Sequence, residues 1–597
     1  MYSPVPQQYR KPRIGPADLF VISLFIFFLY GTVVTAQRWN AHFQPDFSIS
    51  LDTSSLILYS VYSLFRALIA YLMSLIFTLT VGYVAAKYKT AEQVVIPMLD
   101  IGQSIPVLAL LPGLVLGLVS VFPNSNLGLE IACIVAIFTG QVWNMAFSFY
   151  SSVKAVPKHF YELSKNVQLS FFQQFTYVEL PYSSSGLAWN SLMSMAGGWF
   201  FLTVCEAFTL DTDKQFRLPG LGSYMAVAIE KGETHAMIWG VVAMITLIVG
   251  MDFIIWRPII AWTRRFQLDE QQDTPQEIPY FQQLIQDSKI VRRIEGLFLS
   301  ILRSGARKPA VLNLKEDEVE QRILFSRRIA RHIKKSSHHF EALKQSAAVR
   351  FILSKAAFLT FLTTGVLVSA KVYVFLLPLT KSDYALIASS TVYTFLRVAF
   401  TLIISTIWAV PFGVWVGLSQ KRTQFFQPFV QVAASFPAPM LYPIVLTVLA
   451  YLDIQIGFGS SVLMLLGVQW YVLFNVLAGT TMISREMRDT FKIIGLSRID
   501  VWKNLYLPSI FPALVTGWVT AAGGAWNASV VAEYIQYKGQ TLKAVGLGAL
   551  ISDASSHGNY SLLAGSVIAM VLVVVGFNRL VWHRLYQLIE RRFKLER

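Results

Sequence analysis

Predominantly apolar runs of 20 residues or more alternate with short polar segments along this chain. A helix needs about 20 apolar residues to cross the hydrocarbon core of a membrane. Six such runs lie before residue 265 and six after residue 350, at 17–36, 56–86, 94–121, 129–151, 183–208, 236–262, 354–377, 388–419, 428–452, 459–480, 510–533 and 561–583. The pattern therefore predicts an all-α integral membrane protein with about 12 transmembrane helices.

The composition agrees with a membrane protein. Hydrophobic residues make up 54% of the chain and charged residues only 14%, about half the share of a soluble protein. These values exclude an ordinary soluble enzyme. The net charge of +16 is not a nucleic-acid footprint, because the basic residues fall in the loops between apolar runs. Cys133 and Cys205 both lie inside such runs, so no disulfide framework is expected.

The orientation follows from the loop charges. Lysine and arginine gather in alternate loops and near the end of the sequence, for example at Lys87, Lys154, Arg264 and Arg591. Basic loops stay on the cytoplasmic side of a membrane. We therefore expect a multi-pass protein of the cytoplasmic (inner) membrane with both termini cytoplasmic. The first run is longer than a signal-peptide core, so we interpret it as a retained membrane anchor.

One segment departs from this composition. Residues 263–350 hold 28 charges in 88 positions. They separate the chain into a first transmembrane repeat (1–262), a charged cytoplasmic linker (263–350) and a second transmembrane repeat (351–597). Apolar residues between 281 and 301 recur at helical spacing, which predicts at least one amphipathic helix in the linker. A solvated helical linker, a helix on the inner leaflet and a contact with a cytoplasmic partner all fit this pattern.

The two membrane segments are copies of one another. At an offset of 331 residues Tyr62 aligns with Tyr393, Arg66 with Arg397 and Pro106 with Pro437; at 327, Trp199 aligns with Trp526 and Glu206 with Glu533; at 326, 220–222 aligns with 546–548. Each repeat has six runs, an even number, so both enter the membrane the same way. The repeats are therefore parallel and should pack around an axis along the membrane normal, with a solute pathway between them.

A polar segment interrupts each repeat between its fourth and fifth runs. We call residues 157–181 the first loop and residues 484–508 the second loop. The second loop predicts two short helices that break near Gly495, since glycine tolerates a left-handed backbone. Pro508 is expected to begin the next membrane helix.

This loop resembles the "EAA" loop of ABC importer permeases. Asp489, Gly495 and Leu507-Pro508 stand at the positions of that pattern, while the first loop keeps Glu162 and Leu180-Pro181 but has Gln168 in place of the glycine. Over both repeats the chain is similar to the nitrate/sulfonate/bicarbonate (taurine-type) branch of type I, binding-protein-dependent permeases. That similarity rests on residues 63–66, 103–112, 521–526, 531–533 and 546–548.

The resemblance implies the fold and the partners. The fold would be that of a fused type I ABC importer permease, with two copies of a cytoplasmic ATPase and an extracytoplasmic solute-binding protein. The implied ATPase-coupling residues are Glu162, Leu163, Ser164, Leu169 and Ser170 in the first loop and Asp489, Thr490, Gly495, Leu496 and Ser497 in the second. The chain has no phosphate-binding loop of the Walker type. It is therefore not the ATPase, and the resemblance implies a permease and no enzyme, with no cofactor of its own, while ATP and Mg²⁺ would be bound by the ATPase.

Ionisable residues inside membrane runs are functional candidates. Glu206 and Glu533 lie 25 residues beyond the Leu-Pro pairs, about 37 Å along a helix, which places them near the outer interface together with Arg66 and Arg397. They either bridge neighbouring helices or rim the outer mouth and meet the solute or binding protein. Trp199, Trp526 and Asn527, beside Gly197 and Gly523-Gly524, belong to close helix packing or to the translocation path.

The expected function is import of a small solute, an oxyanion or sulfonate such as nitrate, taurine or bicarbonate. An ion-gradient-driven secondary transporter is the alternative, although it would need charged groups at the membrane midplane. A fused permease for another solute, such as ferric ion, is a further one. No metal-ligand spacing or nucleophile motif supports a membrane enzyme. The solute cannot be named, because its binding protein is a different chain.

Overall fold

The computed structural model describes residues 16–39, 48–208, 217–263 and 372–592, with the single positions 266, 293, 363, 369 and 370. The chain forms two compact units, and the first of them contains both transmembrane repeats (Met1–Arg292 and Thr380–Arg597). The linker predicted at 263–350 lies almost entirely outside the described residues, and of the run at 354–377 only residues 363, 369, 370 and 372–377 are described.

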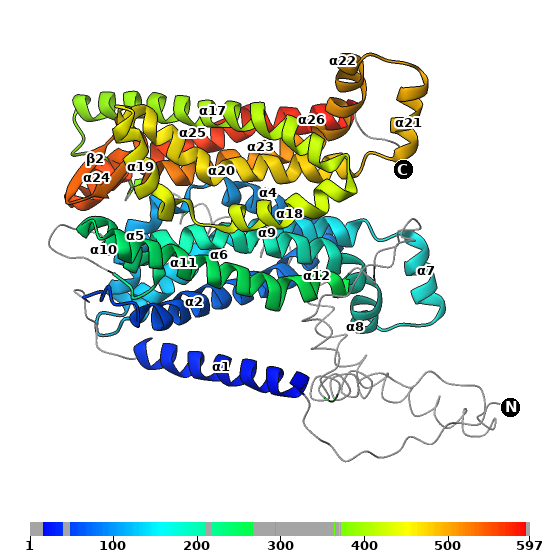
Figure 1. The fold of residues 1–597 in the computed structure, drawn as a ribbon, viewed down its shortest axis with the longest axis horizontal. Coiled ribbons are helices and arrows are strands. Elements are labelled where there is room, and N and C mark those ends of the chain that lie inside the picture. Colours follow the sequence, from blue (N-terminus) through cyan, green and yellow to red (C-terminus); the bar gives the residue numbers. More distant parts are fainter. Residues whose placement is uncertain are drawn as a thin grey trace. The chain divides into compact units, whose positions relative to one another are not determined.

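The first repeat is a bundle of helices (Figure 1). In chain order its elements are α1 (Pro16–Trp39), α2 (Ser55–Phe77), the π-helical turn η1 (Thr78–Gly82), α3 (Tyr83–Lys87), α4 (Lys89–Ser104), α5 (Val107–Val121), α6 (Leu127–Lys154), α7 (Lys158–Asn166), α8 (Phe171–Gln174), η2 (Phe175–Glu179), α9 (Leu180–Glu206), α10 (Leu221–Lys231), α11 (Thr234–Met251), η3 (Asp252–Trp256) and α12 (Arg257–Thr263).

The described helices of the second repeat follow the same order, and this repeat contains one antiparallel hairpin, in which Tyr534 pairs with Lys543 and Tyr537 with Gln540. The aligned residues of the first repeat lie largely outside the described ranges. Its elements are α17 (Lys381–Gly417), α18 (Gln420–Ser435), η5 (Ala438–Leu441), α19 (Tyr442–Tyr451), α20 (Ile456–Thr481), α21 (Arg485–Ile493), α22 (Arg498–Val501), η6 (Trp502–Tyr506), α23 (Leu507–Ala532), β1 (Tyr534–Tyr537), β2 (Gln540–Lys543), α24 (Leu547–Ser556), α25 (Tyr560–Phe577), η7 (Asn578–Trp582) and α26 (His583–Arg592).

The duplication read from the sequence extends to the boundaries of these elements. Helix α4 maps onto α18 at an offset of 331, α7 and α8 onto α21 and α22 at 327, and α11 onto α25 at 326, in each case with the same first and last position. The π-turns η2 and η6 also coincide at 327, and η3 and η7 at 326. Both loops project from the same end of the bundle (Figure 1), as parallel repeats require.

The third run of each repeat differs from the single span that was predicted for it. It breaks into two helices that meet at 95° in the first repeat (α4 and α5) and at 89° in the second (α18 and α19). Proline cannot donate a backbone hydrogen bond and pushes the residue before it out of helical conformation. Ile105 and Phe436 accordingly adopt extended backbone, with ψ of 123° and 128°. These spans are broken rather than bent.

The start of the fifth span also differs from the prediction. Pro508 does not begin a separate helix, because α22, η6 and α23 run on as one apolar helix over Arg498–Ala532. The π-turn Trp502–Tyr506 directly precedes the Leu507-Pro508 pair. A π-turn shifts the hydrogen-bond ladder by one residue and so absorbs the donor that proline lacks. The second loop is therefore joined rigidly to a membrane span.

Among the described residues, eight helices are long and apolar enough to cross a membrane, or ten if each broken pair counts as one span. Helix α9, the counterpart of α23, is not among them. It is equally long, with 27 residues, but carries several serines. With α9 counted, the only predicted run without a described helix of spanning length is 354–377.

The two repeats contact each other through their broken third spans. Helices α4 and α5 pack against α23, α24 and α25 of the second repeat, while α18 and η5 pack against α9 and α11 of the first. Two polar contacts mark these exchanges: Asn578 donates from Nδ2 to Asp100 Oδ1 at 3.4 Å, and Gln431 donates from Nε2 to Asp252 Oδ1. The contacts are related by the repeat, and each joins an aspartate of the first repeat to an amide of the second.

Candidate functional site

The charged residues singled out in the membrane runs form one buried cluster in each repeat. In the first, Arg66 Nη1 donates to Glu206 Oε1 at 2.7 Å, and Ser63 Oγ donates to the same carboxylate at 2.7 Å. Glu206 also accepts from the backbone N–H of Gly222 at 2.8 Å. Arg66 is 1% exposed and Glu206 fully buried. The carboxylate therefore ties α2, α9 and the start of α10 together.

The second repeat builds the same cluster with different neighbours. Arg397 Nη1 donates to Glu533 Oε1 at 2.8 Å, Thr394 Oγ1 donates to it at 2.9 Å, and the N–H of Gly548 donates to Oε2 at 2.9 Å. Glu533 is fully buried and Arg397 is 9% exposed. The structure thus brings Arg66 together with Glu206 and Arg397 with Glu533, as bridges between neighbouring helices within each repeat.

The sequence analysis missed a second acid in the first cluster. Glu130 of α6 accepts from Arg66 Nε at 2.6 Å and from Nη2 at 2.7 Å, and it is 1% exposed. At the aligned position of the second repeat stands Gly457, whose carbonyl oxygen accepts from Arg397 Nε at 2.8 Å. A buried acid inside an apolar run, aligned with a glycine, was a signal that the sequence did contain.

Near the middle of the fifth spans, the glycine and tryptophan residues have different surroundings. Trp199 and Trp526 are both 2% exposed and pack inside the protein. Gly197, Gly523 and Gly524, with Asn527, instead line a small cavity of about 80 Å³ between the repeats. The Tyr471 ring lies so close to Gly524 that a Cβ there would approach it to 3.2 Å. These glycines both line space and allow close packing.

Asn527 joins the two repeats. Its Oδ1 accepts from the backbone N–H of Leu108 at 3.2 Å, and its Nδ2 donates to the carbonyl oxygen of Gly523 at 3.0 Å. Leu108 is the second residue of α5. The N–H groups in the first turn of an α-helix have no partner within the helix. Asn527 therefore caps the broken third span of the first repeat. The aligned residue of the first repeat, Phe200, cannot do the same.

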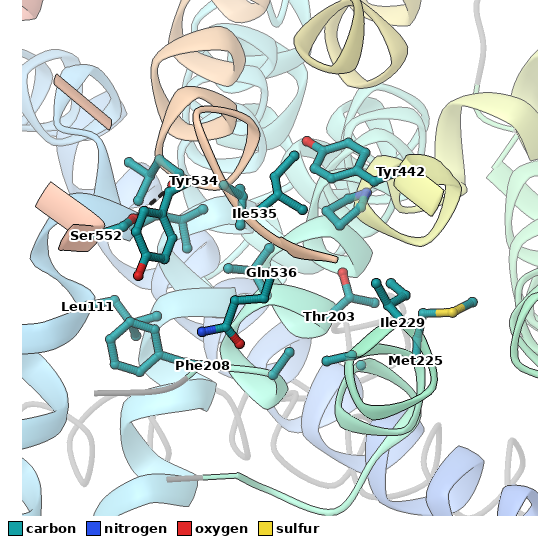
Figure 2. Close-up of a pocket in the computed structure, with 18 of the residues that line it drawn as sticks. Leu111, Thr203, Phe208, Met225, Ile229, Tyr442, Tyr534, Ile535, Gln536 and Ser552 are labelled. Atoms are coloured by element: carbon teal, nitrogen blue, oxygen red, sulfur yellow. Dashed lines mark hydrogen bonds between the residues drawn. The ribbon is translucent and has the colours of Figure 1, made fainter. Parts of the chain in front are cut away.

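A larger cavity of about 210 Å³ lies between the repeats beyond the breaks of the third spans. By the same measure one water needs about 15 Å³, so a small solute fits. Figure 2 shows Tyr442, Tyr534 and Ile535 of the second repeat above the cavity, and Thr203, Phe208 and Met225 of the first below it. We call it the axial cavity, because ten aligned pairs of positions line it: 108/439, 111/442, 203/530, 204/531, 207/534, 208/535, 225/551, 226/552, 229/555 and 230/556.

The coupling residues implied by the loop pattern mostly face solvent. Glu162, Leu163 and Ser170 of the first loop are exposed, Leu169 is half-buried and Ser164 is buried; Asp489, Thr490, Gly495, Leu496 and Ser497 of the second are exposed. Large apolar side chains on the two loops are unusually open to solvent, among them Leu163 (62%) and Ile493 (86%). Exposed apolar surface of this kind marks a contact with another protein or a membrane.

The two loops turn alike although their sequences differ. Gly495 has φ of +72° and Gln168, at the aligned position, has φ of +56°. The second short helix of each loop then begins with a capped serine: Ser170 accepts from the N–H of Gln173, and Ser497 from the N–H of Asp500. The first loop therefore keeps the turn despite its missing glycine, at the cost of a strained backbone.

In each repeat the loop is anchored to the end of the second membrane span. The interactions that anchor it differ between the two repeats. In the first repeat Lys87 pairs with the buried carboxylate of Glu179, which also accepts from Tyr83 Oη at 2.7 Å. Burial, and then the Glu179 charge, raises the pKa of the neighbouring Tyr161 to about 12, so this phenol stays neutral at physiological pH. In the second repeat Arg488 donates to the carbonyl oxygen of Leu418 at 2.9 Å.

Two like-oriented bundles around an axial cavity, each with an exposed loop at the same end, define a duplicated membrane permease. The model of the family described as "Binding-protein-dependent transport system inner membrane component" matches residues 78–255 and again 409–595. The chain belongs to this family and carries its domain twice.

Curated relatives are permease proteins of transport systems. The chain is 28% identical to the nitrate import permease protein NrtB of Leptolyngbya laminosa, over 31% of this chain and 63% of that one. It is 26% identical to the taurine transport system permease protein TauC of Escherichia coli, over 31% and 68%, and 23% identical to the glycine betaine/carnitine/choline permease OpuCB of Bacillus subtilis, over 32% and 81%. The chain spans about three fifths of the length of the nitrate permeases it matches.

Proposed function

We propose that this chain is the complete pair of membrane domains of an ATP-driven importer for a small oxyanion or sulfonate. One observation carries the proposal: a solute-sized cavity lies between two aligned repeats whose exposed loops project from one end. The names of the nitrate and taurine permeases support the solute class. Membership in a binding-protein-dependent family supports delivery by a separate solute-binding protein on the outer face.

Two copies of a cytoplasmic ATPase would dock on the two loops. The exposed apolar residues of α7 and α21 give each copy a surface to bury, and each loop continues through a π-turn into a membrane span. Closure of the ATPase pair around ATP and Mg²⁺ would draw the loops together and turn the cavity outward. Such alternating access needs only that nucleotide and loaded binding protein favour one state. In this arrangement the loops, and both termini, lie in the cytoplasm and the chain in the inner membrane.

A gradient-driven transporter would bind its coupling ion at charged groups beside the solute path. Among the described residues that line the axial cavity, the charged ones are Arg217 and Glu230, and they pair with each other at 2.7 Å. The buried acids Glu206 and Glu533 are held by arginines inside their own repeats. This charge arrangement favours the ATP-driven mechanism.

The test uses the second loop. Gly495→Pro forces a φ near −65° where the turn needs +72°, and should abolish co-purification of the ATPase with a correctly folded chain. Lys543→Gln, an exposed residue of the β hairpin far along the sequence from the loop, is the control. Wild-type stoichiometry in Gly495→Pro would contradict the docking role of the loop. Uptake that persists after ATP depletion at constant membrane potential would instead support the gradient-driven alternative.

A further inference from the structure

The small cavity beside the paired glycines lies closer to the loops than the axial cavity does. Residues between 193 and 201 of α9 and between 519 and 527 of α23 border it, whereas Thr203 and Val530, further along the same helices, border the axial cavity. Both helices begin at the loops. A solute that leaves the axial cavity toward the loops therefore meets the small cavity next. We call it the inner cavity.

The inner cavity lies on the axis that relates the two repeats. Three aligned pairs of residues line it: Asn144 with Tyr471, Met193 with Thr520, and Gly197 with Gly524. The Tyr471 side chain reaches from one repeat to the other. A Cβ on Gly524 of its own repeat would approach the ring to 3.2 Å, and a Cβ on Gly197 of the other repeat would approach the hydroxyl oxygen to 3.3 Å. The phenol hydroxyl therefore lies between the repeats.

The polar groups of the inner cavity are free to bind a solute. Gln103, Asn144 and Tyr471 line it, and their side chains make no hydrogen bond to another described residue. Their polar atoms also retain surface that a water-sized molecule can reach, since none of them is sealed inside the protein. An open amide or phenol in an otherwise packed interface offers its donor to whatever occupies the space.

The volume of about 80 Å³ limits the occupant. One water needs about 15 Å³ by the same measure, so the inner cavity holds about five water molecules or a solute of a few non-hydrogen atoms. An oxyanion of that size fits, as does the sulfonate group of a longer solute.

The electrostatics of the inner cavity favour an anion. None of the described residues that line it carries a charge. Helix α5 begins at Val107, which borders the cavity, and the first N–H groups of a helix carry a partial positive charge. Neutral donors and one helix end attract an anion without holding it as a lysine or arginine would. Such weak binding suits a transport site, which must release its solute.

We propose that the inner cavity is a solute-binding site of the translocation path, in which Gln103, Asn144 and Tyr471 donate hydrogen bonds to the oxygen atoms of an oxyanion or sulfonate. This rests on the proposed function. Gln103 and Asn144 belong to the first repeat and Tyr471 to the second, so a movement that parts the repeats also separates the donors and releases the solute.

The first experiment measures uptake by the full chain with its ATPase and binding protein in proteoliposomes, with nitrate, taurine and glycine betaine as probes. Tyr471→Phe and Asn144→Leu remove a donor at nearly constant volume. Each should lower uptake of the transported oxyanion about tenfold, because hydrogen bonds to charged groups are strong and the rate depends exponentially on the barrier. Tyr393→Phe is the matched control, since this phenol of α17 is 51% exposed and lines neither cavity.

The second experiment detects the solute at the site without transport. The natural Cys133 and Cys205 are 2% and 6% exposed, so a water-soluble methanethiosulfonate reagent should modify them slowly. Asn144→Cys should react, and the oxyanion that the wild type transports should slow the reaction several-fold, whereas chloride at equal concentration should not. A purely structural role of Asn144 predicts no such protection.

The outcomes distinguish the two proposals. If the wild type takes up nitrate or taurine and both Tyr471→Phe and Asn144→Leu retain that uptake within twofold, the inner site is overturned and the proposed function stands. An unreactive or unprotected Asn144→Cys overturns the inner site in the same way. Wild-type uptake of glycine betaine alone overturns the proposed solute class and the inner site together. Should Tyr471→Phe fail to fold, Asn144→Leu and the labelling of Asn144→Cys decide the matter.

Discussion

The buried Arg66 cluster permits a quantitative comparison between the two repeats. Arg66 donates four hydrogen bonds: two to Glu130, one to Glu206 and one to the carbonyl oxygen of Pro219. Arg397 donates three, of which only one reaches a carboxylate, that of Glu533. Replacing Arg66 with glutamine leaves two buried carboxylates without their arginine partner, whereas Arg397→Gln leaves one.

The expected loss of folding free energy follows from the number of carboxylates that lose their arginine. Removing one partner of a buried ion pair costs about 3–5 kcal/mol, because the remaining charge stays buried and unpaired. We expect Arg397→Gln to destabilise the protein by about that amount and Arg66→Gln by more. For a chain of 597 residues, a loss of this size lowers the unfolding midpoint by roughly 2–4 °C. Lys543→Gln, whose pair with Asp553 is 43% and 35% exposed, should cost less than about 1 kcal/mol.

The assay is thermal unfolding of the purified protein in detergent, followed by the monodisperse fraction that remains after heating. Adding Glu130→Gln to Arg66→Gln removes one stranded carboxylate and should restore part of the loss, a coupling that independent sites would not show. The reasoning is refuted if Arg66→Gln unfolds no earlier than Arg397→Gln, or if Glu130→Gln restores nothing. Retained uptake in Glu206→Gln would separately exclude a solute-contacting role for that carboxylate.

Two further predictions concern the loops and the interface between repeats. Gln168→Gly should stabilise the first loop by about 1 kcal/mol, because glycine adopts φ of +56° without strain, and slower amide hydrogen exchange in residues 158–174 would verify it; unchanged exchange would mean that the turn is not strained. Gln431→Glu places a second carboxylate against Asp252 across the interface and should lower the unfolding midpoint, whereas the exchanged pair Asp252→Asn with Gln431→Glu should recover it. A double variant no better than the single one would show that this contact does not join the repeats.

Rules that act over a few neighbouring residues predicted much of the fold. Offsets of 331, 327 and 326 between repeated residues became identical helix boundaries in α4 and α18, α7 and α21, and α11 and α25. The turn expected at Gly495 is present, and the same turn forms at Gln168 although the sequence analysis had no glycine there to predict it. The third span shows the limit: the sequence predicted one span there, whereas the structure breaks it by about 90°, and the two segments pack against the other repeat.

The candidate sites were also predicted only in part from the sequence. Spacing along a helix placed Arg66 and Glu206 at similar depth, and the structure pairs them. Glu130 joins them from another helix, and no spacing rule links positions 64 residues apart. The axial cavity is lined by residues of both repeats, so it exists only once the two copies pack together.

The sequence by itself determined that this chain spans a membrane, that it contains two parallel copies of one bundle, and where most helices begin and end, because hydrophobic length, proline and glycine act within a few residues of the backbone. Only the tertiary structure decided which carboxylates share an arginine, how the broken third spans cross between the repeats, and which side chains border the cavity. Those outcomes depend on contacts between segments 64 or more residues apart, and the two repeats place different side chains at aligned positions of these contacts.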